Sequence, residues 1–213
     1  MSPGARRWAS RAAIALACVV GALILVILGV FGSGYLRPFY LPSEGMAPTL
    51  EKNDHLLARM SGAKDLRRGD VILLRVGEAI YVKRLAGLPG DTIGLREGIV
   101  ILNGRPVPQR LLGEERRTDF TGPQTVRRLA ERFPGEASEH HIYDSEPSMV
   151  DEAEERKVPP GRVFVLGDNR DRSADSRVPR TQMGVDLLPV EDVRGYALFY
   201  SWPPAKMGLK VNR

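Results

Sequence analysis

The sequence has little cysteine, few aromatic side chains and no large excess of charge of either sign. Cys18 is the single cysteine in 213 residues, which excludes an intrachain disulfide and a zinc site built on cysteine ligands. The formal net charge of +5 is too small to indicate nucleic-acid binding and is typical of a mildly basic, solvated surface. A hydrophobic content of 43% excludes a wholly disordered chain, and a mean hydropathy of −0.20 excludes a multi-pass membrane protein.

Glycine and proline, by contrast, are frequent, with 22 and 16 residues. Together with only 7% aromatic residues, this composition favours a turn-rich, mainly β fold over a helix bundle. The segment IVILNGRPV at residues 99–107 predicts a hairpin with Asn103 and Gly104 at its tip. Short apolar or alternating runs predict strands at residues 55–59, 70–75, 80–85, 98–102, 163–166 and 196–200.

One long uncharged run, residues 12–31, predicts a transmembrane anchor, because a helix of this length, rising about 1.5 Å per residue, spans a bilayer. Arg6, Arg7 and Arg11 precede the run without an acidic residue. The positive-inside rule therefore places the N-terminus in the cytoplasm and the main domain on the outer, periplasmic or extracellular side of a single-pass cell-membrane protein. A cleaved signal peptide is the competing interpretation, but its apolar region is shorter, about 7–15 residues.

These observations divide the chain into a cytoplasmic N-terminus, the anchor and one β domain at residues 35–213. Within this domain we expect core segments at residues 38–109 and 158–205. Residues 110–157 are dense in charge of both signs and have no long apolar run, so we interpret them as a peripheral insertion that is solvated. Residues 125–133 predict a short amphipathic helix inside it.

Three separated stretches concentrate the chemically useful side chains: LPSEGMAPTL at residues 41–50, RGDVILLRVGEAIYVKRLAGLPGD at residues 68–91 and GDNRDRSADSR at residues 167–177. The third stretch directly follows an apolar strand. It is either a surface loop of compensating ion pairs or a buried hydrogen-bond network that orients a site, since aspartate and asparagine favour tight turns and arginine pairs in a planar fork. Composition alone does not separate these two interpretations.

Lys83 lies in an otherwise apolar strand of the second stretch. Alternation places Tyr81 and Lys83 on one face and Val82 and Arg84 on the other, so one of the two cations is expected to face inward or along a sheet edge. An inward lysine loses hydration, which lowers its pKa as a general base requires. Taken by itself, Lys83 is better interpreted as an edge-strand lysine that protects against aggregation.

Together, the three stretches resemble the bacterial type I signal peptidases, membrane-anchored serine endopeptidases with a Ser/Lys dyad. In that family, Pro-Ser-x-Ser-Met-x-Pro-Thr-Leu carries the nucleophile, and an Arg-Gly-Asp strand follows. Next come Tyr-x-Lys-Arg-x-x-Gly-x-Pro-Gly-Asp, which carries the base, and Gly-Asp-Asn-Arg-Asp-x-Ser-x-Asp-Ser-Arg. The order, the spacing and the N-terminal anchor match here, and the resemblance extends from the anchor to about Trp202.

The resemblance implies a role for each motif position. Lys83 would be the general base, Ser173 would orient it, and Ser43 would complete an oxyanion hole beside the backbone N–H of residue 45. An extended peptide would add main-chain hydrogen bonds to a strand. The ion pairs that brace the site would come from Arg68, Arg84, Asp168, Asp175 and Arg177. Shallow pockets for small side chains at the −1 and −3 positions of the substrate would be lined by Leu41, Pro42, Met46, Leu50 and Val82.

The sequence departs from the family pattern at the nucleophile, because Gly45 precedes Met46 where the family has serine. No acyl-enzyme can form on a glycine. Three hypotheses remain: Ser43 substitutes, a water activated by Lys83 attacks, or the chain is catalytically silent and only binds. Side chains at positions 43 and 45 of an extended strand lie about 6–7 Å apart, so substitution by Ser43 is disfavoured.

We therefore expect a signal peptidase I-like membrane protein that binds signal peptides of exported proteins and, by family, cleaves them after small residues, with cleavage impaired by Gly45. The rival hypothesis is an inactive, membrane-anchored binding or regulatory module of the same fold. Expected partners are signal peptides and membrane lipid, and association with the secretion machinery or an active paralogue stays open. We expect no nucleic acid, because the excess of positive charge is small, and no cofactor, because no phosphate-binding loop with Gly-Lys-Ser/Thr is present. We also expect no metal, because His55, His140 and His141 have no evident partners in the sequence, and we interpret the adjacent pair His140-His141 in its charged stretch as solvated.

Overall fold

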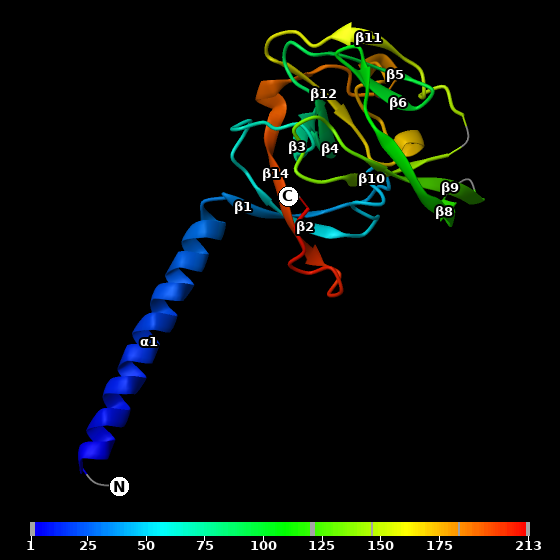
Figure 1. Cartoon of the computed structure of the whole chain (residues 1–213). Coiled ribbons are helices and arrows are strands. Elements are labelled where there is room, and N and C mark those ends of the chain that lie inside the picture. The colour runs from blue at the N-terminus through cyan, green and yellow to red at the C-terminus, as the bar shows by residue number, and fades with distance from the viewer. Residues whose placement is uncertain (1–2, 120–121, 146, 183, 212–213) are drawn as a thin grey trace. The chain divides into compact units, whose positions relative to one another are not determined.

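The structure, a computed structural model, describes residues 3–119, 122–145, 147–182 and 184–211. The chain divides into two compact units, residues 1–37 and residues 38–213. The first unit consists mainly of helix α1 (Pro3–Gly32), drawn in blue in Figure 1. Its segment Ala13–Gly32 is long and apolar enough to cross a membrane, by length and composition.

The second unit is built from β-sheets, which confirms the mainly β fold expected from the sequence (Figure 1). The largest sheet has seven strands in the order β1-β2-β14-β3-β4-β12-β13. From β2 to β13, neighbouring strands pair antiparallel. The strands are β1 (Leu36–Tyr40), β2 (His55–Arg59), β3 (Val71–Val76), β4 (Ala79–Gly87), β12 (Arg162–Leu166), β13 (Leu188–Pro189) and β14 (Val193–Trp202).

Two smaller antiparallel sheets complete this unit, with the orders β11-β5-β6-β7 and β10-β9-β8. Their strands are β5 (Thr92–Arg96), β6 (Ile99–Leu102), β7 (Arg105–Pro106), β8 (Gln109–Asp119), β9 (Gly122–Glu131), β10 (His140–Asp144) and β11 (Ala153–Lys157). Among the described residues, single turns of 3₁₀ helix lie at η1 (Arg170–Arg172), η2 (Arg180–Gln182) and η3 (Val190–Asp192).

The predicted hairpin is confirmed. Strands β6 and β7 pair through Leu102 and Arg105, and the two residues between them, Asn103 and Gly104, have φ angles of 53° and 73°. Two consecutive positive φ angles define the turn type that matches the twist of a two-residue hairpin. Each of the six predicted strand segments also overlaps an observed strand, with its ends shifted by at most three residues.

The largest sheet is covered on both faces. Alternate residues of β3 belong to two different apolar clusters, since Val71 and Leu73 pack on one side and Ile72 and Leu74 on the other. A strand buried on both faces hides every side chain, whichever way it points. The neighbouring strand β4 shares this environment at its C-terminal half, where residues 83–87 are all buried.

The insertion differs from the prediction in two ways. Residues 125–133, expected to form a helix, lie mostly in strand β9 and pair with β8 and β10. The insertion is also not solvated throughout, because β9 and β10 carry buried side chains, including Leu129, Glu131 and Ile142. Because β9 pairs with a strand on each side, its backbone N–H and C=O groups are hydrogen-bonded. This stabilisation by strand pairing outweighs the helical spacing of its apolar residues.

Candidate active site

Lys83 lies near the middle of β4 and is 6% exposed. Its Nζ donates a hydrogen bond to Ser173 Oγ at 2.8 Å, which joins two segments that are 90 residues apart in the sequence. The sequence predicted that one cation of this strand faces inward. Both are buried, because Arg84 is only 4% exposed. Since both faces of the sheet are covered, alternation sends Lys83 and Arg84 into two different polar surroundings.

Gly45 lies directly against the Lys83 amine. A Cβ atom built on Gly45 would sit 3.2 Å from Lys83 Nζ and 3.2 Å from the Arg172 carbonyl oxygen. The glycine is buried and its φ lies outside the left-handed region, so the backbone suits a residue with a side chain. A neighbour would have to move by only a few tenths of an ångström to admit one.

The segment around Gly45 is a turn, whereas the sequence analysis treated residues 43 and 45 as part of an extended strand. The Ala47 N–H donates to the Glu44 carbonyl and the Leu50 N–H donates to the Met46 carbonyl. Ser43 is exposed at the start of this turn, and its hydroxyl forms no hydrogen bond with any residue that the structure describes. The 6–7 Å separation expected from strand geometry therefore does not apply here.

Burial lowers the pKa of Lys83 from 10.5 to about 8, because the charged ammonium loses its hydration. Asp175 and Asp168 oppose this shift through their negative charges, and Arg177 adds to it. A lysine with a pKa near 8 has a substantial neutral fraction at mildly alkaline pH. The neutral amine can then accept a proton from a group placed beside it.

The polar block at residues 167–177 is a buried network, which decides between the two interpretations of this stretch. Arg177 donates from Nε and Nη2 to the two carboxylate oxygens of Asp175, both at 2.9 Å, and both side chains are almost fully buried. Asp175 also accepts a hydrogen bond from the Gly167 N–H at 2.9 Å. Gly167 must be a glycine, because a Cβ there would collide with the Ser173 side chain and the Gly45 carbonyl oxygen.

A second buried pair lies on the Arg84 side of the strand. Arg84 donates to Asp168 Oδ1 from Nε at 2.7 Å and to Oδ2 from Nη2 at 2.6 Å. Arg84 also donates to the Gly69 carbonyl at 2.6 Å and to Thr49 Oγ1 at 3.2 Å, so it connects β4 to the turn that carries Gly45. Burial alone would raise the pKa of Asp168, but the Arg84 guanidinium holds this pKa below its ordinary value.

The remaining predicted residues are placed less closely together. Arg68 pairs with Asp91 at 2.6 Å and donates to the Ala86 carbonyl, so it braces the neighbouring loop rather than the Lys83 amine. Of the predicted pocket residues, Pro42 is exposed and Val82 is half-buried. The other three, Leu41, Met46 and Leu50, are at most 4% exposed and belong to the apolar cluster that packs on the β3 face of Val71.

Sequence reasoning missed the role of His140, which is buried at 7% exposure rather than solvated. Its ring lies 3.2 Å from Glu131 and 2.9 Å from Glu136, while Arg170 forms a fully buried pair with Glu131. His141, also expected to be solvated, lies 2.9 Å from an Arg128 nitrogen. These contacts could not be predicted from the local sequence. Except for Glu136, which is four residues from His140, the partners lie in β9 or η1, whereas both histidines lie in β10.

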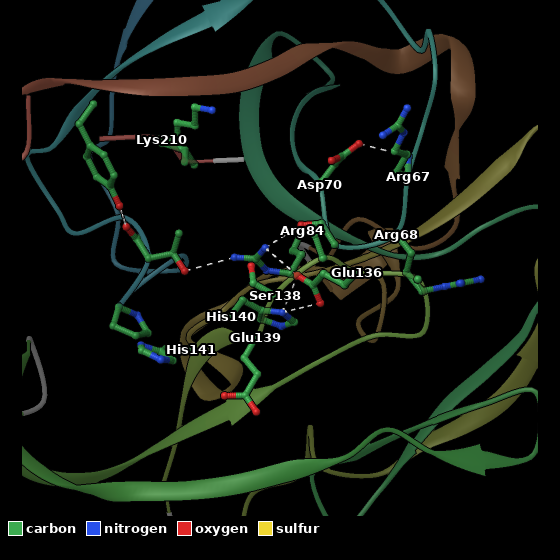
Figure 2. A pocket seen from close by; sticks show the side chains of 17 residues that line it. Arg67, Arg68, Asp70, Arg84, Glu136, Ser138, Glu139, His140, His141 and Lys210 are labelled. Atoms are coloured by element: carbon green, nitrogen blue, oxygen red, sulfur yellow. Dashed lines mark hydrogen bonds and ion pairs between the residues drawn. The ribbon is translucent and has the colours of Figure 1, made fainter. Parts of the chain in front are cut away.

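A polar cavity of about 260 Å³ opens on the Arg84 side of this network (Figure 2). Figure 2 shows Arg84 and His140 with Glu136 between them, and Arg67, Asp70 and Lys210 at the periphery. Lys83, Gly45 and Ser173 do not line this cavity. This polar cavity is therefore separate from the Lys83 amine.

Comparison with known proteins points to one family. The sequence model of the family described as "Signal peptidase, peptidase S26" matches residues 8–202. Signal peptidase I of Pseudomonas aeruginosa is 33% identical over 217 residues, covering 89% of this chain and 73% of that protein. Signal peptidase I of Bacillus licheniformis is 30% identical, covering 85% of each. A crystal structure of a signal peptidase I from Enterococcus faecalis covers 62% of this chain and 97% of that one, with 26% identity and a TM-score of 0.35.

Proposed function

The chain belongs to the signal peptidase family, peptidase S26, and from that premise we propose that it binds signal peptides of exported proteins beside Lys83 but cleaves them poorly, because Gly45 stands at the position of the nucleophile. The observation that carries the proposal is the 3.2 Å between Lys83 Nζ and a Cβ built on Gly45. A hydroxyl borne on that carbon would lie within hydrogen-bonding reach of the amine, as a nucleophile and its base require.

Two further observations on Lys83 support a Ser/Lys mechanism. Lys83 has a lowered pKa, and its hydrogen bond to Ser173 fixes the direction of the amine. The Asp175–Arg177 pair supports the segment that carries Ser173. We assign Lys83 as the general base and Ser173 as its positioning residue.

The edge of β4 next to Lys83 supports binding of an extended peptide. Residues 79–84 pair with β3 on one side, whereas the ladder with β12 begins only at Arg84, which pairs with Leu166. In the part of the chain that the structure describes, residues 79–83 therefore have no strand partner on the β12 side. A peptide added there would gain main-chain hydrogen bonds and pass the half-buried Val82.

The oxyanion of a tetrahedral intermediate would be held by backbone near Gly45. The Gly45 carbonyl accepts a hydrogen bond from the Asn169 N–H at 3.3 Å, while the Gly45 N–H has no acceptor among the described residues. An unpaired N–H beside the base is a suitable donor for a developing negative charge. Ser43, exposed beside it, would supply the second donor after a peptide binds.

With Gly45 in place, hydrolysis depends on a water molecule or on the exposed Ser43. In a triad enzyme that has lost its catalytic residues, binding and the oxyanion hole retain about 10³–10⁴ of the acceleration over water. We therefore assign weak or undetectable cleavage and intact peptide binding to this chain. The basic residues Arg6, Arg7 and Arg11, which precede the apolar segment Ala13–Gly32, support a cytoplasmic N-terminus with the peptide site on the outer side of the membrane.

Binding is tested with the unmodified chain in detergent and a fluorescent signal peptide that has alanine at −1 and −3. We expect saturable binding with no product, and much weaker binding of a matched peptide with phenylalanine at −1. Equal binding of both peptides, or no binding of either, contradicts the proposed site. Cleavage by a Gly45→Ser variant tests the catalytic half of the proposal.

A further inference from the structure

Three aspartates outside the Lys83 site converge in the insertion and η1. Asp144 ends β10, Asp151 lies in the following loop, and Asp171 lies in η1. One carboxylate oxygen from each falls within 4.8 Å of the others. Asp144 and Asp151 are buried, at 4% and 8% exposure, and Asp171 is half-buried. We call these three residues the aspartate cluster.

One oxygen of the cluster is buried without a partner. Asp144 Oδ2 pairs with Arg127, but Asp144 Oδ1 has no hydrogen-bond donor among the described residues, although it is shielded from solvent. A buried carboxylate oxygen without a donor loses its hydration and gains nothing in return. Such an oxygen is an available ligand for a group that supplies positive charge.

Asp151 and Asp171 share one hydroxyl donor on their Oδ1 atoms, whereas their Oδ2 atoms accept the N–H groups of Ser148 and Ser145. The Ser148 Oγ lies 3.1 Å from Asp151 Oδ1 and 2.8 Å from Asp171 Oδ1. A serine hydroxyl carries one hydrogen, so it can satisfy only one of the two carboxylates at a time. The second oxygen then faces the hydroxyl lone pairs without a proton between them.

The negative net charge of the aspartate cluster also favours a bound cation. Three carboxylates and the paired Arg127 sum to a formal charge of −2. Two further arginines lie nearby, but both are already neutralised. Arg170 forms a buried pair with Glu131, and Arg177 forms one with Asp175.

We propose that Asp144, Asp151 and Asp171 bind one divalent cation, with Ca²⁺ as the best fit. An all-oxygen donor set suits hard cations, and the formal charge of −2 matches a divalent one. Ca²⁺ accepts about six to eight oxygen ligands in flexible geometry, whereas Mg²⁺ demands a near-ideal octahedron and is usually held by one or two carboxylates together with water. Three protein carboxylates from β10, a loop and η1 therefore favour Ca²⁺.

A cation here would connect the insertion to the segment behind Lys83. Asp171 lies two residues before Ser173, and the neighbour of Asp144, Tyr143, donates its N–H to the Asp168 carbonyl at 2.9 Å. Binding would fix the loop that carries Asp151 against η1. The proposal does not rest on peptide binding and is tested independently of it.

The test is thermal unfolding of the full chain in detergent, in EGTA, in about 1 mM CaCl₂ or in about 1 mM MgCl₂, the range in which extracellular calcium sites work. We expect Ca²⁺ to raise the midpoint by about 3–6 °C at tenfold excess over its dissociation constant, and Mg²⁺ to raise it less. The shift should vanish in Asp144→Asn and in Asp171→Asn. Asp192→Asn is the matched control, because Asp192 pairs with Arg75 in a different part of the domain, and it should keep the shift.

Equilibrium dialysis with radioactive calcium gives a second measurement on the unmodified chain, which holds even if a variant fails to fold. We expect one calcium ion per chain, saturable and released by EGTA. Absence of stoichiometric binding at about 1 mM Ca²⁺ overturns the proposal. An equal thermal shift in Asp144→Asn and the unmodified chain overturns it as well.

Discussion

Replacing Lys83 by methionine tests the physical basis of the site, because it removes the buried amine and keeps an unbranched side chain of similar length. Lys83 is 6% exposed, and its pKa is lowered from 10.5 to about 8 by the loss of hydration on burial. A base whose pKa falls on folding binds its proton more weakly in the folded state. The charged amine therefore destabilises the fold below pH 8, and this penalty disappears as the pH rises toward 10.5.

The magnitude follows from the shift of the pKa. A change from 10.5 to about 8, at about 1.4 kcal/mol per pKa unit, corresponds to about 3 kcal/mol at pH 7 and to less than about 1 kcal/mol at pH 10.5. We expect Lys83→Met to increase the free energy of unfolding by about this amount at neutral pH. The gain should shrink at alkaline pH. Packing differences between lysine and methionine do not depend on pH, so they cancel when the two pH values are compared.

The assay is urea unfolding of the unmodified chain and of Lys83→Met in detergent, at several pH values between about 6.5 and 10.5, on either side of the lowered pKa. Lys52→Met is the matched control, because Lys52 is exposed and its replacement should change stability by less than about 0.5 kcal/mol at each pH. A stability gain that is independent of pH, or a loss at pH 7, would refute the argument that Lys83 is a desolvated amine.

Three further predictions concern the parts around the amine. Asp175→Asn leaves the buried Arg177 without its counter-charge and should lower the free energy of unfolding by about 3–5 kcal/mol in urea titrations. Gly167→Ala introduces a Cβ that collides with Ser173 and with the Gly45 carbonyl, so we expect a loss of about 1–3 kcal/mol, and an unchanged midpoint in thermal unfolding would contradict this packing. In a Gly45→Ser variant, the rate of peptide cleavage should rise with pH to a midpoint of about 8 and then level off, and a rate that is flat between pH 6 and pH 9 would exclude the buried amine as base.

Local patterns in the sequence were sufficient to predict most of the sheet. Strand β2 coincides with its predicted segment, and the hairpin at Asn103 and Gly104 follows from backbone requirements that few residues other than asparagine and glycine meet. The alternation in β4 predicted one inward cation, but two are buried, because apolar clusters cover both faces of this sheet. Which faces are covered depends on segments far away in the sequence.

The two wrong predictions, a helix at residues 125–133 and a solvated His140, also depend on contacts with other elements. Residues 125–133 have apolar side chains at helical spacing, yet they form most of β9, because β8 and β10 supply partners on both of its sides. His140 was assigned to solvent, and its burial depends on Glu131 from β9 and Glu136 from the preceding loop. The proximity of Gly45 and Lys83, by contrast, is predicted by the family resemblance, because both positions match motifs of the family. Composition and spacing alone predict that Lys83 is a lysine on an edge strand.

The most direct test of the central claim is cleavage of a secretory precursor in detergent by three proteins: the unmodified chain, Gly45→Ser, and the double variant with Gly45→Ser and Lys83→Ala. The account predicts that only Gly45→Ser cuts after the small residues, with a gain on the order of 10³-fold or more over the unmodified chain. A folded Gly45→Ser that cuts no faster would show that this glycine does not occupy the nucleophile position. Efficient cleavage by the unmodified chain, abolished by Lys83→Ala, would show that Ser43 or water already serves as the nucleophile.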